Sequence, residues 1–194
     1  ALGFNPPDPN NMRRPPRGKS DPLISKYTLL RYVVTGTYVG AATVGAFIYQ
    51  YKKMGMPLSR MRSWAECTTW DPADVGGGYT LACDAFDASQ GKLLPSSVAL
   101  STLVAMEMLR ALCSVSDTQS LLEKPFWANK WLLGGITFPT VLHLGVLYTP
   151  TLAKLFQLAP LTKADWHTVA AFAGPLVLLE EVLKLIARCL GLQM

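Results

Sequence analysis

The sequence predicts an all-α membrane protein with four transmembrane helices. Half of the 194 residues are hydrophobic and only 16% are charged. The apolar residues gather in four blocks, each approaching the roughly 20 residues that a helix needs to cross about 30 Å of hydrocarbon. Within each block they cover all faces of a helix instead of one stripe, which disfavours the rival fold, a soluble helical bundle.

The predicted elements follow one another along the chain. Residues 1–27 are rich in Pro and Arg, cannot build a core, and are expected to form an extended cytosolic linker. The transmembrane domain is expected over residues 28–194. It contains a long polar loop at 51–93, and its spans lie at about 28–50, 94–114, 131–148 and 168–190.

Charge and cysteine positions set the expected orientation. The basic N-terminal segment places both termini in the cytosol by the positive-inside rule, so loop 51–93 would be lumenal or extracellular. The net charge of +5 fits this topology, and no basic patch interleaved with aromatic residues points to nucleic acid. Cys67 and Cys83 share the loop, in a compartment where disulfides persist. A bridge there would close about 16 residues and contribute roughly 3 kcal/mol in the chain-entropy model.

Glu107 is the most informative single residue. It lies within residues 98–112, which otherwise have the composition of a membrane span. A carboxylate near the bilayer centre is costly unless it is paired, so such residues usually face protein and mark an ion or substrate path. The alternative is that Glu107 is protonated, or paired with Arg110 one turn further on. In either case we expect it to face the helix bundle or a partner helix.

Other features of the spans have structural interpretations. Gly36 and Gly40 form a G-x-x-x-G pattern that Gly45 continues, which is typical of close helix packing in membranes. Glu180 and Lys184 are four residues apart on one helix and are expected to form a structural ion pair.

Three further residues inside the spans also have structural interpretations. Pro139 and Pro175 are expected to kink their helices, which membrane bundles tolerate. His143 is expected to be a hydrogen-bonded interior histidine and not a metal ligand.

No motif in the sequence supports catalysis by this chain. We find no P-loop, no D-K-T-G-T phosphorylation motif, no Gly-rich nucleotide loop and no Ser–His–Asp set. No catalytic residue is therefore assigned. Phosphoryl transfer needs positioned phosphates, a metal and an acceptor, so the chain alone is not expected to hydrolyse ATP or pump ions.

Several motifs, in order, resemble the sarco/endoplasmic-reticulum-type Ca²⁺-ATPases. ALGFNPPD resembles the loop after their sixth helix, and RYVVTGTYVGAATVGA their seventh helix. ALSTLVAMEMLRAL resembles the eighth helix and PLVLLEEVLKLIAR the tenth. Cys67 and Cys83, followed by D-A-F, resemble their lumenal loop and its disulfide. The resemblance covers nearly the whole chain and implies the C-terminal membrane portion of a P-type calcium pump, helices seven to ten, in the endoplasmic reticulum.

The resemblance also implies roles for particular residues. Glu107 matches the eighth-helix glutamate that contributes an oxygen to one of two calcium sites, and Ca²⁺ prefers carboxylate oxygens. The family's asparagine three residues on is Arg110 here, and its next asparagine is Cys113. A guanidinium at that position would either neutralise the carboxylate and repel a cation, or extend towards the cytosolic interface about two turns away. Ca²⁺ would be the transported ion, and the partners would be membrane lipids and the remaining transmembrane helices.

Three functions remain open from the sequence. The first is the C-terminal membrane support module of a calcium-transporting ATPase. The second is a non-catalytic accessory or structural subunit derived from such a pump within a larger membrane complex. The third is a small ion channel or carrier that uses Glu107, and it is the least favoured because one carboxylate makes a poor selective site.

Overall fold

The structure, a computed structural model, describes residues 25–114 and 129–190. Nearly all of the predicted linker, and most of the connection between the second and third spans, lie outside the described residues. All regular secondary structure in the described parts is helical, and they contain no strand. The helices are α1 (Lys26–Lys53), α2 (Leu58–Arg62), α3 (Leu93–Cys113), α4 (Lys130–Tyr148), α5 (Pro150–Leu155), α6 (Lys163–Ala173) and α7 (Pro175–Cys189), with the short 3₁₀ helices η3 (Trp64–Thr69), η4 (Pro72–Val75) and η5 (Ala82–Phe86) between α2 and α3.

Among the described residues, three helices have the length and composition to cross a membrane. They are α1, α3 and α4, with 28, 21 and 19 residues. At 1.5 Å per residue α3 and α4 are about 31 and 28 Å long, close to the hydrocarbon thickness of about 30 Å, and α1, at about 42 Å, is longer. The predicted class, an all-α membrane protein, is confirmed.

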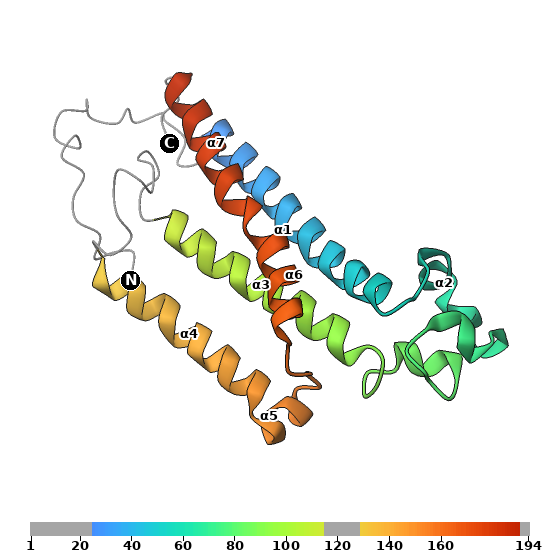
Figure 1. Cartoon of the computed structure of the whole chain (residues 1–194). Helices are drawn as coiled ribbons and strands as arrows, with labels where there is room; N and C mark the ends of the chain where they lie inside the picture. Colours follow the sequence, from blue (N-terminus) through green and yellow to red (C-terminus); the bar gives the residue numbers. More distant parts are fainter. Residues whose placement is uncertain (1–24, 115–128, 191–194) are drawn as a thin grey trace, which may run out of the picture.

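The fourth apolar block is divided between two helices. α6 and α7 have 11 and 15 residues and meet at Gly174 and Pro175. Gly174 keeps helical dihedral angles, and its N–H donates to the Ala170 carbonyl at 2.8 Å. Pro175 has no N–H to continue this ladder, so the hydrogen bonds are interrupted although the direction is kept. In Figure 1, α6 and α7 follow each other along one side of the bundle.

The helices pack as a bundle of α1, α3 and the α6–α7 pair, which lie side by side (Figure 1). Small residues on α1, Ala42 and Ala46, let the other helices approach closely, and Met106 of α3 and Leu176 of α7 are fully buried in the core. α4 lies on the outer side of α3. It contacts α3 and α5, but its own buried residues are near its two ends.

The segment between α1 and α3 folds into a small unit of its own. Its core contains Trp70 and also Tyr51 from the last turn of α1, whose hydroxyl donates to the Ala85 carbonyl at 3.0 Å. Cys67 and Cys83 are bridged, with 5.1 Å between their Cα atoms. The predicted disulfide is confirmed, and the bridge holds η3 against η5.

Candidate functional site

Glu107 lies on the outer face of α3. α3 packs against α1, α6 and α7 through one face, on which buried residues recur at helical spacing: Val98, Thr102, Met106 and Cys113. Glu107 follows Met106, about 100° further round the helix, and half of its side chain is exposed. The chain's own bundle therefore does not cover this carboxylate.

Arg110 is the ionic partner of Glu107 within the chain. Its Nη1 atom lies 3.6 Å from Oε1 of Glu107, one turn further along α3, and about a third of the Arg110 side chain is exposed. The separation is longer than that of a strong bidentate pair. The guanidinium reduces the negative charge at this surface without enclosing the carboxylate.

The described residues do not complete a metal site around Glu107. They contain no group of three or more His, Cys, Asp and Glu side chains that could hold a metal ion. Calcium takes about six to eight oxygen ligands. One carboxylate on the outside of α3 can therefore contribute to a calcium site only if other helices supply the remaining oxygens.

The polar residues of α7 are partnered differently from the sequence prediction. Glu180 pairs with Arg31 of α1, not with Lys184: Nη2 and Nε of Arg31 lie 2.7 and 3.0 Å from Oε2 of Glu180. Lys184 is fully buried, donates to the Cys113 carbonyl at 2.8 Å, and lies 3.5 Å from Glu181. Because α1 and α3 pack against α7, they bring stronger partners than the neighbouring turn of the same helix.

The glycines of α1 divide into two groups. An added Cβ at Gly45 would lie 3.1 Å from the ring of Phe172, so Gly45 is where α6 approaches α1 closely. Gly36 and Gly40 are exposed, and an added Cβ there would meet no atom within 4 Å. The expected packing face is used within the described chain only at Gly45.

A polar network around the buried Asp165, which the sequence did not predict, lies at the other end of the bundle. Oδ1 of Asp165 accepts hydrogen bonds from Gln50 and Lys53 at 3.1 and 3.0 Å, and Oδ2 accepts from the backbone and hydroxyl of Thr162. Burial would raise the pKa of Asp165, but the hydrogen bonds from Thr162, Lys53 and Gln50 lower it below its usual value. The T-x-x-D spacing is a capping-box signal that was available in the sequence. No local pattern connects Lys53 to a residue 112 positions away.

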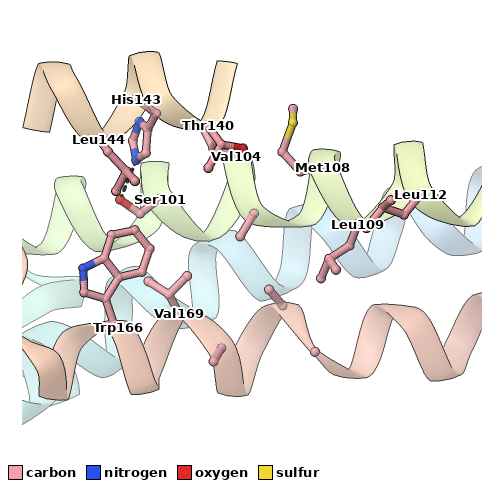
Figure 2. Close-up of a pocket in the computed structure, with 14 residues that line it drawn as sticks. Ser101, Val104, Met108, Leu109, Leu112, Thr140, His143, Leu144, Trp166 and Val169 are labelled. Atoms are coloured by element: carbon pink, nitrogen blue, oxygen red, sulfur yellow. Dashed lines mark hydrogen bonds between the residues drawn. The ribbon is translucent and has the colours of Figure 1, made fainter. Parts of the chain in front are cut away.

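His143 has the hydrogen bond that the sequence predicts. Its Nε2 atom lies 2.9 Å from the Ser101 hydroxyl, which joins α4 to α3. Both residues line a cavity between α3, α4 and α6, and Figure 2 shows them at one end of it. The sequence did not predict this cavity, because it depends on how the helices are spaced.

Comparison with known proteins identifies the family. The family described as "Cation transporting ATPase, C-terminus" matches residues 1–186. The chain is 40% identical over 211 aligned positions to "Calcium-transporting ATPase 4, endoplasmic reticulum-type" and 39% identical over 214 to "Calcium-transporting ATPase 2, endoplasmic reticulum-type", both of Arabidopsis thaliana. Each comparison covers 97% of this chain and 20% of the relative, so the chain spans about a fifth of their length. The chain belongs to the family of C-terminal membrane regions of cation-transporting ATPases.

Proposed function

We propose that this chain is the C-terminal membrane support module of a pump that transports calcium, with Glu107 as one of the ligands along the ion path. The observation that carries the proposal is a carboxylate within an apolar helix, half exposed on the face that its own bundle leaves uncovered. Such a group is stable in a membrane only when other protein or water faces it. A neighbouring set of transport helices would supply that environment.

The remaining ligands would come from helices outside this chain. Calcium needs about six to eight oxygens, which Glu107 alone does not provide. The exposed Gly36 and Gly40 on α1 offer a second surface where a partner helix could approach closely. Both features support an architecture in which α1 and α3 pack against transport helices while α4 faces lipid.

We propose an endoplasmic-reticulum-type membrane with both termini cytosolic. The relatives are named for that compartment, and the disulfide suits a lumenal loop. The free, exposed Cys189 at the end of α7 should then react with a membrane-impermeant thiol reagent from the cytosolic side. A cysteine placed at Gln157, between α5 and α6, should react only from the lumenal side. Reaction of both from one side would contradict the topology.

A second candidate function is favoured by Arg110. Its guanidinium, 3.6 Å from Glu107, weakens the site for a cation. A non-catalytic accessory subunit, derived from a pump but packed into another membrane complex, would keep the fold and the disulfide without the need for calcium. The two functions differ in whether Glu107 affects transport.

Co-expression with the missing part of a relative distinguishes the two functions. The chain would be expressed with the N-terminal portion of an endoplasmic-reticulum-type calcium pump truncated before this region, and ATP-dependent ⁴⁵Ca²⁺ uptake into vesicles would be measured. If Glu107 is a ligand, Glu107→Gln should weaken apparent calcium affinity by roughly tenfold, which is about 1.4 kcal/mol, and Arg110→Asn should strengthen it.

The matched control is Glu181→Gln, which changes a carboxylate on α7 that lies against Lys184, away from the proposed ion path. It should leave calcium affinity unchanged. Uptake that is insensitive to Glu107→Gln and Arg110→Asn would reject the ligand role. Failure of the chain to restore uptake at all would favour the accessory subunit.

A further inference from the structure

The groove between α3, α4 and α6 has a volume of about 380 Å³ (Figure 2). Cavities of this size, mostly apolar with a few converging polar groups, are typical small-molecule sites. Glu107 does not line the groove, so this site is separate from the proposed calcium ligand. Its lining includes Ser101, Val104, Met108 and Leu112 of α3, His143 of α4, and Trp166 of α6.

The groove is elongated along the helices. Ser101, Val104, Met108 and Leu112 recur at three- and four-residue spacing, so they form one face of α3 over three turns. At 1.5 Å per residue this face is about 16 Å long. A ligand of matching shape is long and narrow and lies parallel to the spans.

The groove exists because α4 is held at its ends. Only Leu132 and Leu147 are buried among the residues of α4. An added Cβ at Gly134 or Gly145 would meet nothing within 4 Å. A gap in the apolar part of a membrane bundle is filled by apolar molecules and not by water, because its walls offer water too few hydrogen bonds.

The two ends of the groove differ in polarity. The Ser101–His143 hydrogen bond lies at the end near Trp166, whose indole N–H donates to the Tyr148 hydroxyl at 2.8 Å. Trp and Tyr side chains of this kind mark the membrane–water interface. The other end, near Leu112, is apolar. This gradient suits an amphiphile with its head at the interface and its body in the hydrocarbon.

The head should be a single neutral hydroxyl. No lining residue carries a carboxylate, ammonium or guanidinium group, so nothing in the groove would pair with a charged headgroup. Nε2 of His143 bonds Ser101, whereas Nδ1 has no hydrogen bond within the described parts of the chain. A hydroxyl both donates and accepts, so it satisfies Nδ1 in either tautomer of the ring.

The walls of the groove favour a flat, rigid body. Small residues on the α6–α7 side, Ala170, Ala173 and Gly174, make a smooth surface, whereas Val104, Met108 and other bulky residues of α3 make the opposite wall uneven. We propose that this groove binds a membrane sterol, with its hydroxyl hydrogen-bonded to His143 and its ring system along α3 and α6.

Photolabelling in lipid nanodiscs tests the proposal. The 194-residue chain would be labelled with a photoactivatable sterol that keeps its free hydroxyl, and the cross-linked residues would be mapped by mass spectrometry. We expect cross-links on the groove faces of α3 and α6, competed by unlabelled sterol. His143→Phe should weaken labelling roughly three- to tenfold, as expected for one lost hydrogen bond. Ala170→Trp, which fills the groove, should abolish it.

The controls separate sterol binding from other occupancy. His167→Phe, on the same helix as Trp166 but outside the groove, should label like the unchanged chain once thermal unfolding shows that all variants fold. A probe with hydrogen in place of the hydroxyl should label several times less. The proposal would be overturned if that probe labelled the chain equally well, or if Ala170→Trp left sterol labelling unchanged. It would also be overturned if phosphatidylcholine, but not unlabelled sterol, displaced the probe. Loss of labelling on co-expression with the remaining pump helices would identify protein as the occupant and also overturn it.

Discussion

Breaking the ion pair between α1 and α7 should destabilise the bundle more than any exposed pair. The Arg31 and Glu180 side chains are only 12% and 5% exposed, and their charged atoms approach to 2.7 Å. Removing one partner of a buried pair leaves the other charge poorly solvated, which costs about 3–5 kcal/mol. Arg31 keeps some contact with solvent, so we expect Glu180→Leu to lower the free energy of unfolding by about 3 kcal/mol.

A double-mutant cycle isolates this pair from its surroundings. Arg31→Met, Glu180→Leu and the double variant would be unfolded with denaturant in mild detergent and followed by tryptophan fluorescence. The coupling energy should be about 2–3 kcal/mol, because the second substitution removes a charge that has already lost its contact with the first residue. The matched control is Asp74→Asn: its pair with Arg60 has the same 2.7 Å separation, but the two side chains are 34% and 48% exposed. That change should cost less than about 1 kcal/mol.

Two results would refute the reasoning. One is a cost for Glu180→Leu no larger than that of Asp74→Asn, which would mean that burial does not strengthen the pair. The other is additivity of the two single changes, which would mean that Glu180 and Arg31 do not interact energetically. A larger coupling of Glu180 to Lys184 would restore the ion pair expected from the spacing on α7 alone.

Three further predictions concern packing, the disulfide and pH. Gly45→Leu should destabilise the chain by about 1–3 kcal/mol relative to Gly36→Leu, because only the first intrudes on a neighbouring side chain; equal thermal midpoints would contradict this. Replacing both Cys67 and Cys83 by Ser should remove roughly 3 kcal/mol from the bridged segment, measured as faster proteolysis between α1 and α3; unchanged cleavage would argue against a stabilising bridge. The pKa of Asp165 is lowered in the folded state. Its contribution to folding stability is therefore complete above the unfolded pKa of about 4 and is lost as the pH falls through the pKa of the folded state. The thermal unfolding midpoint of the Asp165→Asn variant should therefore depend less on pH below about 4 than the midpoint of the unchanged chain. Identical dependence of the two midpoints on pH would count against this network.

The sequence by itself determined the class, the helices and the loop. Length and apolar content of a block are local properties, so the spans at 28–50, 94–114 and 131–148 correspond to α1, α3 and α4. The effect of Pro175 is local as well: it interrupts the helical hydrogen bonds of the fourth block. The disulfide could also be predicted from the sequence, because the two cysteines share a loop and resemble a family motif.

Only the tertiary structure decided which side chains meet. Glu180 is 149 positions from Arg31, and no spacing along α7 reveals that α1 lies beside it. The outward direction of Glu107 depends on which face of α3 its neighbours cover. The groove beside His143 depends on α4 being held only at its ends. Each of these follows from the relative placement of whole helices, which is set by packing over the entire interface and not by the pattern within any one helix.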